Sequence, residues 1–401
     1  MLTPKRPLSL GEFTVLVAMM VSIVALSTDI MLPALDLIGE ELNVIHRNDV
    51  QMVVSALFLG FAVGQVAVGP LADSFGRKPV IYAGYGVFIL GCVLSIFAQA
   101  FEWMLVGRVL QGLGAAAPRV VTTALVRDGY EGRAMARIMS LIMAVFIIVP
   151  AIAPAIGQVI IAFAGWRATF VALLVLASTA AVWFALRQPE TLAVEARRPF
   201  SLGNIMRGIG EILRMRAVVG YTLCAGCVFG AFLGYLSSAQ QIFVDTYGAG
   251  EKFALYFGIA SLAIGAASLL NARLVMRLGM RYLVWRALVV LALISGVLAL
   301  ALAFTAFALP LWAFMAWQMP AFFCVGLLFG NLNALAMNPV GHMAGLGAAF
   351  LGSMSTLISL PLGWSIGAAY DGTPLPLIAG FGVLGVCALA VMAWTDRGES
   401  E

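Results

Sequence analysis

The stretch 69–79, GPLADSFGRKP, places Asp73, Arg77 and Lys78 within six positions between two long apolar segments. Such a concentration of charge is unusual in this chain, because only 10% of its residues are charged. Two glycines and two prolines interrupt the same stretch, and both residue types are typical of turns. The pattern predicts a short polar loop between two apolar helices.

The composition places this loop in a membrane protein. Of the 401 residues, 62% are hydrophobic, and the mean hydropathy is +1.02. A soluble fold of this length could not bury so much apolar surface. A bilayer core of about 30 Å needs roughly 20 apolar residues per helix, and strand-length alternating segments are absent. We therefore expect an all-α membrane protein.

Apolar runs broken by charge or by Gly and Pro predict twelve transmembrane helices. Their ranges are 13–38, 49–71, 80–99, 102–127, 135–163, 167–186, 218–244, 252–276, 282–305, 309–337, 342–370 and 374–394. Arg and Lys gather in alternate loops, whereas the opposite loops hold only Arg47, Arg167 and Lys252. This alternation favours an even number of spans with both termini in the cytoplasm.

The longest polar stretch, 187–216, separates six spans from six. We expect an N-terminal six-helix half over 1–186, a cytoplasmic linker over 187–217 and a C-terminal six-helix half over 218–401. The linker is expected to contain a short amphipathic helix at about 201–214.

A weak internal repeat supports the two halves. The segment ADSFGRKPVIYAG (72–84) has an echo in VMRLGMRYLVWRA (275–287), which aligns Gly76 with Gly279. Both segments follow the second span of their half. The repeat therefore predicts duplicated halves.

Several motifs resemble one known family. GPLADSFGRKP resembles the loop signature between the second and third spans of the major facilitator superfamily. The other matching motifs are STDIMLPAL (27–35), RVLQGLGAA (108–116), RDGYEGR (127–133) and NPVGHMAGLGAAFLGS (338–353). Together they are most similar to the bicyclomycin/chloramphenicol-efflux type of proton-coupled drug antiporter. The resemblance implies the major facilitator fold, with twelve spans in two six-helix halves.

The resemblance also assigns a role to the polar loop. It implies that Asp73 meets the start of the eleventh span, near His342, and that Arg77 pairs with Asp128. The predicted conformational latch consists of Gly69, Asp73, Gly76, Arg77, Lys78, Asp128 and His342. A simpler explanation stays open, since Arg77 and Lys78 also satisfy the bias of positive charge toward the cytoplasm.

The fifth span departs from the family pattern. Pro150 and Pro154 each remove an intrahelical hydrogen bond, which predicts a bend that ends near Gly157. The family pattern Gly-Pro-x-x-Gly-Gly, associated with antiport, is present here as the segment 153–158, APAIGQ, without two of its glycines. An uptake symporter or facilitator therefore stays open as an alternative.

Two charged residues within predicted spans are candidates for proton coupling. Asp29 and Arg108 fall at similar depths, so the two side chains could pair. A buried carboxylate beside an arginine can gain or lose a proton as the arginine moves. The alternative is a static ion pair that fixes helix packing.

A substrate cavity is predicted from the remaining polar residues of the spans. Its expected lining is Arg119, Gln111, Gln240, Gln241, Asn331 and Asn333. Arg119 lies eleven positions after Arg108 and so shares its helix face. Arg119 could instead be a structural partner of Asp128 or extend along lipid, and the amides could instead join helices.

These observations predict a secondary transporter of the bacterial inner membrane that exports small amphipathic compounds in exchange for protons. A metabolite symporter or facilitator is the first alternative, and a membrane-embedded sensor or enzyme is the second. No catalytic motif, ATPase motif or Cys/His cluster is visible. We therefore expect no enzyme activity, no cofactor, no metal site and no nucleic-acid partner. The protein is expected to work as a monomer whose partners are substrate, protons and lipid.

Overall fold

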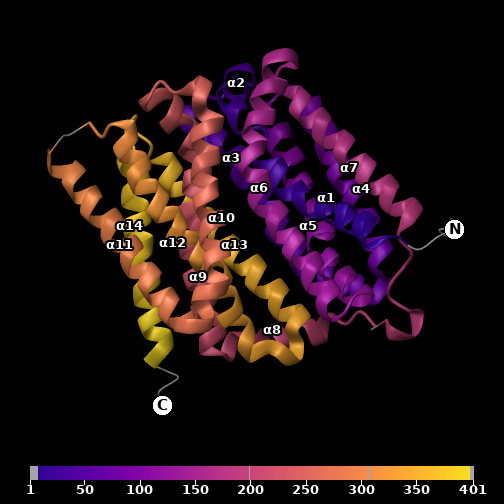
Figure 1. Cartoon of the computed structure of the whole chain (residues 1–401). Coiled ribbons are helices and arrows are strands. Elements are labelled where there is room, and N and C mark those ends of the chain that lie inside the picture. The colour runs from indigo at the N-terminus through magenta and orange to yellow at the C-terminus, as the bar shows by residue number, and fades with distance from the viewer. Residues whose placement is uncertain (1–7, 198, 306–307, 398–401) are drawn as a thin grey trace. The chain divides into compact units, whose positions relative to one another are not determined.

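The structure, a computed structural model, describes residues 8–197, 199–305 and 308–397, and every regular element within these ranges is a helix (Figure 1). Ten stretches of these residues are long and apolar enough to cross a membrane. One of them, Leu311–Ala368, is 58 residues long and contains two long helices. The chain is therefore a multi-pass, all-helical membrane protein. The number of twelve spans stays a prediction.

The helices form two compact units. The first unit takes in the chain up to Ile45 and then Met52–Ile205, and the second takes in His46–Gln51 and the chain from Met206 onward. The long helices of the first unit are α1 (Leu10–Asp29), α3 (Met52–Phe75), α4 (Arg77–Ile96), α5 (Phe101–Gly129), α6 (Gly132–Ala164) and α7 (Arg167–Arg187). Those of the second are α9 (Arg216–Gln241), α10 (Phe253–Leu278), α11 (Met280–Thr305), α12 (Leu311–Met337), α13 (Ala344–Ala368) and α14 (Leu375–Arg397). Two shorter helices are α2 (Leu35–Glu41) and α8 (Leu202–Arg214).

The two units share one pattern of helix pairing. In the first, α5 packs against α3 and α4, α6 against α1, and α7 against α4. In the second, α12 packs against α10 and α11, α13 against α9, and α14 against α11. Gly76 and Gly279 join matching helices with positive φ angles of 102° and 80°. L side chains rarely adopt that backbone conformation. The predicted repeat is therefore present in the structure.

The motif 108–116 explains how α5 fits between two neighbours. A Cβ atom at Gly112 would lie 1.8 Å from the carbonyl oxygen of Leu57 on α3. A Cβ atom at Gly114 would lie 2.4 Å from the backbone nitrogen of Phe88 on α4. Small residues allow helix backbones to approach this closely within a membrane. The glycines therefore set the spacing of the helices around Arg108.

We expect Gly112→Ala to destabilise the protein, because the new methyl group would overlap the backbone of α3. Overpacking of this kind costs about 1–3 kcal/mol. The apparent unfolding temperature in detergent should fall. Gly86→Ala on α4 is the matched control, because nothing lies within 4 Å of a Cβ atom there. Equal unfolding temperatures for the two variants would contradict the close-packing role.

The first predicted span, 13–38, is interrupted in the structure. Helix α1 ends at Asp29, a short 3₁₀ turn follows at Leu32–Ala34, and α2 begins at Leu35. Pro33 lies in this turn and has no backbone N–H to continue the helix. The interruption places Asp29 at a helix end.

Helix α7 is fastened near both ends of the α1–α2 segment. Each of two carboxylates is bound by one arginine and one tryptophan of the α7 region: Glu12 by Arg187 and Trp183, and Glu41 by Arg167 and Trp166. Charge-assisted bonds of this kind are stronger than neutral ones. They fix the register of α7 along α1 and α2.

One short segment of the chain, His46–Gln51, lies between α2 and α3 but belongs to the second unit. We call it the strap. Gln51 Nε2 donates to Gln241 Oε1 at 2.8 Å and to the carbonyl oxygen of Gly367 at 3.0 Å. Arg47 pairs with Asp245 at 2.9 Å. The strap is therefore held mainly by side-chain hydrogen bonds to the ends of α9 and α13.

Two further groups complete the surroundings of the strap. Asn48 Nδ2 donates to the carbonyl oxygens of Ala368 and Tyr370 at 3.1 and 3.0 Å. The Tyr370 hydroxyl donates to the carbonyl oxygen of Gln241 at 3.1 Å. Burial raises the pKa of Tyr370, so its hydroxyl stays protonated and can donate at neutral pH.

Candidate functional site

Asp29 is a buried acid at the end of α1. The residue is only 4% exposed. Helix α6 approaches immediately beyond it, since a Cβ atom at Gly157 would lie 1.9 Å from the carbonyl oxygen of Ile30. Gly157 is the one glycine of the segment 153–158, and it lies where the contact with α1 leaves no room for a side chain. A buried ionisable group within a span is costly and marks a functional candidate.

Arg108 lies in the interior of the first unit with no exposed surface. Its Nη2 donates to the carbonyl oxygen of Ser27 at 2.8 Å, and its Nε donates to that of Val53 at 3.1 Å. Its Nη1 donates to Gln111 Oε1 at 2.6 Å. The guanidinium therefore joins α1, α3 and α5 through a fork of donors that only arginine supplies.

The predicted ion pair between Asp29 and Arg108 is absent. Within the part of the chain that the structure describes, no carboxylate lies within 4.0 Å of the Arg108 guanidinium, and Asp29 forms no ion pair. Arg108 instead binds the backbone of α1 two residues before Asp29. Similar depth along the helices does not bring the two side chains together, because backbone carbonyl oxygens and Gln111 take up the donors of the guanidinium.

Gln111 is also committed within the first unit. It has no exposed surface, accepts from Arg108 and donates to the carbonyl oxygen of Gly91 and to Ser95 Oγ on α4. Its place in a substrate cavity stays a prediction. These contacts do show that Gln111 orients Arg108.

The polar loop contains a buried arginine. Arg77 is 7% exposed, and it donates to Asp73 Oδ1 at 2.5 Å and to Asp128 Oδ2 at 3.2 Å. The pair with Asp128 is the one that the family resemblance implies. It joins the start of α4 to the end of α5. The predicted contact of Asp73 with the eleventh span concerns both units and stays a prediction.

Glu190 completes this loop and was missed from the sequence. Its two carboxylate oxygens accept from the backbone nitrogens of Arg77 and Lys78, both at 3.0 Å. An acid at a helix N-terminus satisfies donors that the helix leaves free. Lys78 Nζ in turn donates to the carbonyl oxygen of Gln188 at 2.5 Å, near the end of α7. The only sequence signal was an acid soon after the span 167–186.

The polar residues predicted in the second unit lie in different surroundings. Gln240 and Gln241 are buried, and Gln241 binds the strap. Asn331 is buried and donates to Asn271 Oδ1 at 2.7 Å, whereas Asn333 is exposed. Asn331 therefore joins α12 to α10.

His342 Nε2 lies 3.2 Å from Glu211 Oε1 on α8. Arg119 is half-buried on α5, in the first unit. Gly69 near the end of α3 has nothing within 4 Å of a Cβ position, so close packing does not explain it.

Helix α6 continues through Pro150 and Pro154, since both lie inside Gly132–Ala164. The predicted bend stays a prediction. Among the described residues there is no group of three or more His, Cys, Asp or Glu side chains that could hold a metal ion.

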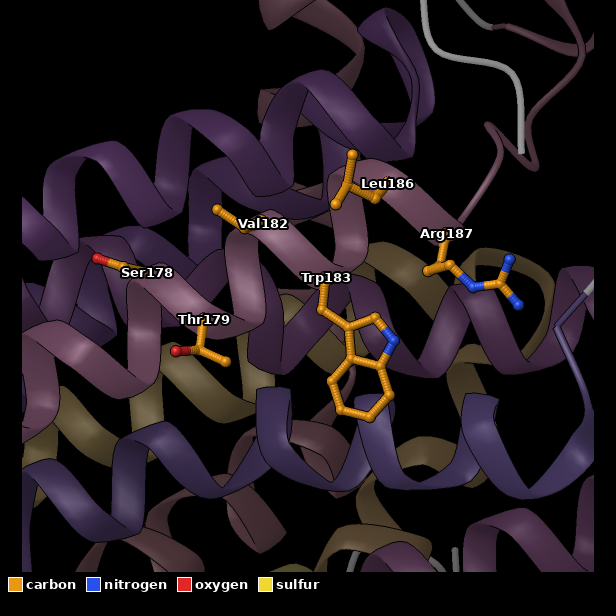
Figure 2. Close-up of a pocket in the computed structure, with 6 residues that line it drawn as sticks. All are labelled: Ser178, Thr179, Val182, Trp183, Leu186 and Arg187. Carbon is orange, nitrogen blue, oxygen red and sulfur yellow. The ribbon is translucent and has the colours of Figure 1, made fainter. Parts of the chain in front are cut away.

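An open groove lies along α7, as Figure 2 shows. Its lining residues are Ser178, Thr179, Val182, Trp183, Leu186 and Arg187. The groove is mostly apolar, and its one charged residue, Arg187, is bound to Glu12. None of the residues predicted for coupling or substrate binding lines it.

A chain with ten membrane-length apolar stretches, two units built on one repeat and buried charges inside one of them has the architecture of a membrane transporter. The comparison with known families gives the same class. Residues 17–368 match the Major Facilitator Superfamily, and the chain belongs to this family. It is accordingly a transporter and not an enzyme.

Curated relatives extend over most of the chain. The chain is 30% identical over 346 residues to "Uncharacterized MFS-type transporter YdgK" of Bacillus subtilis, which covers 86% of this chain and 85% of the relative. It is 27% identical to a "Bicyclomycin resistance protein homolog" of Haemophilus influenzae, with 91% of each chain covered. It is 26% identical to "Multidrug resistance protein D" of Escherichia coli, with 85% of each covered. The resemblance to the bicyclomycin/chloramphenicol type is thereby confirmed.

Solved structures agree on the fold. The xylose transporter XylE from E. coli superimposes with a TM-score of 0.73 at 13% identity, covering 96% of this chain and 97% of that one. The peptide transporter POT gives a TM-score of 0.76 at 13% identity, covering 99% and 96%. At this identity the likeness concerns the fold alone.

Proposed function

We propose that the protein exports small amphipathic compounds in exchange for protons by alternating access, as a monomer of the bacterial inner membrane with twelve spans and both termini in the cytoplasm. The observation that carries this proposal is the buried carboxylate of Asp29 at the end of α1, where the first span is interrupted. A group that can bind and release a proton inside a span is what a proton-coupled exchanger requires. The relatives named for resistance to bicyclomycin and to several drugs support the export of such compounds.

Arg108 supports the coupling. It binds the carbonyl oxygen of Ser27, two residues before Asp29. A change in the protonation of Asp29 would alter the charge close to this anchored segment of α1. Proton binding and a movement of α1 relative to α5 are therefore linked in the proposal.

The polar loop is proposed as the conformational latch. Arg77 joins Asp73 to Asp128, so the carboxylate of Asp73 is held in place at the end of α3. A preformed carboxylate suits an interaction with a helix N-terminus.

Movement of a monovalent charge through 100 mV supplies about 2.3 kcal/mol, enough for roughly a fifty-fold gradient of a neutral substrate.

The test uses inverted membrane vesicles that hold a pre-formed pH gradient. We expect at least one compound from a panel of neutral, cationic and anionic amphipathic molecules to dissipate the gradient. Vesicles without the protein are the control. Uptake that needs no gradient would favour a facilitator. Binding without any movement of the compound would contradict transport by this chain.

A metabolite symporter is the second candidate, because the segment 153–158 lacks two glycines of the antiport pattern. The direction of proton flow distinguishes the two functions. In the same vesicles, a symporter would move substrate and protons in the same direction.

A further inference from the structure

Helix α8 (Leu202–Arg214) is the amphipathic helix that the sequence predicts at about 201–214, and the prediction is confirmed. From Met206 onward α8 belongs to the second unit, and one side of it packs within that unit. Ile212 is fully buried in an apolar cluster with Val218, Val340 and Phe350. A Cβ atom at Gly208 would lie 2.4 Å from Leu346 Cδ2 on α13. This side of the helix is therefore already covered.

A second apolar stripe on α8 stays exposed. Leu202, Met206 and Leu213 are 64%, 59% and 55% exposed. At about 100° per residue these three lie within an arc of roughly 40°, and Ile212 lies about 80–120° away from them. Packing against the apolar cluster around Ile212 does not require this stripe.

Two arginines border the stripe on its other side. By the same rotation, Arg207 and Arg214 lie about 80–140° from the three apolar residues, opposite to Ile212. Both arginines are exposed, and neither forms an ion pair with any of the residues that the structure describes. The order around the helix is thus docking side, exposed apolar stripe, basic edge.

The position of α8 in the chain limits what can cover the stripe. Helix α8 ends at Arg214, and the membrane-length helix α9 begins at Arg216. The last turn of α8 must therefore lie at the membrane boundary. Exposed apolar residues bordered by arginine are typical of helices that lie in the headgroup layer of a bilayer.

We propose that α8 is a lipid-binding helix. Its stripe of Leu202, Met206 and Leu213 enters the boundary between headgroups and acyl chains, and Arg207 and Arg214 bind the phosphate groups of acidic phospholipids. The pair Glu211–His342 and the contact of Gly208 with Leu346 then connect this lipid contact to the start of α13. The proposal depends on the chain being a membrane protein and not on what it transports.

The first test measures the depth of α8 in vesicles. A spin label on Met206→Cys of the full-length protein should be more accessible to oxygen than to a water-soluble nickel chelate. Asn204→Cys is the matched control, since it lies about 160° around the same helix and should show the reverse. The signal from the five native cysteines is measured on the parent protein and subtracted. Two labels equally accessible to the nickel chelate would overturn the proposal. Shielding of both labels from oxygen and from the nickel chelate would also overturn the proposal, because it would show that protein and not lipid covers the helix.

The second test addresses lipid charge. At low salt, the oxygen preference of the Met206 label should rise several-fold when one third of the phosphatidylcholine is replaced by phosphatidylglycerol, and high salt should reverse this rise. Replacing Arg207 and Arg214 together by Gln should remove the dependence. Replacing Arg273 and Arg277 on α10, which are also exposed, should leave it unchanged. An unaltered dependence in the Arg207/Arg214 variant would overturn the assignment of the phosphate contact.

Discussion

Asp29→Asn should abolish proton-driven export while ligand binding and the amount of folded protein stay near those of the parent. The substitution preserves the shape of a side chain that is only 4% exposed, but it removes the one proton that the group can exchange. The residue is buried, and Gly157 brings α6 against the backbone of the next residue, Ile30. We expect the rate of uphill transport to fall at least a hundred-fold, which corresponds to about 2.7 kcal/mol.

The measurement compares uphill flux in energised vesicles with equilibrium binding of the same compound. Glu40→Gln is the matched control, because Glu40 is an exposed acid on α2 and its loss should not alter coupling. Near-normal uphill transport by Asp29→Asn would remove Asp29 from the coupling mechanism. Loss of binding together with transport would place the residue in the substrate site.

The second large effect is expected for Arg108→Lys, which keeps the charge. A lysine ammonium cannot reproduce the planar fork that reaches Ser27, Val53 and Gln111 at once. At least one buried acceptor would lose its donor, and each such loss costs about 1–3 kcal/mol. We expect a lower unfolding temperature and at least a ten-fold loss of transport.

Arg277→Lys provides the control for this substitution, because Arg277 lies exposed near the end of α10. Detergent melting and vesicle flux measure the two effects separately. If Arg108→Lys kept the unfolding temperature of the parent but lost transport, the position of the charge would matter for transport. The hydrogen bonds that join the helices would then not matter for stability. If both stayed normal, the three hydrogen bonds would have no role.

The sequence predicts those features that depend on local pattern. The alternation of apolar runs and the turn glycines Gly76 and Gly279 each depend on residues that are close together in the sequence, so local chain geometry is enough to interpret them. The amphipathic pattern of α8 belongs to the same class. Each of these features has a direct counterpart in the structure.

Features that depend on distant residues are not predictable in this way. Glu190 binds the start of α4 from more than a hundred positions along the chain, and Gln51 binds Gln241 from 190 positions away. The proposed pairing of Asp29 with Arg108 failed for a related reason. Helix depth gives the level of a residue, but it does not show which backbone carbonyls compete for a guanidinium.

The strap has a consequence for the integrity of the chain. A gene split between α7 and α8 would leave residues 46–51 on the first fragment and the side-chain partners described above, such as Gln241 and Gly367, on the second. The second fragment alone would therefore lack six residues of its own compact unit. Complementation between such fragments would require the first to supply those residues in trans. The second unit is therefore not formed by one continuous stretch of the chain.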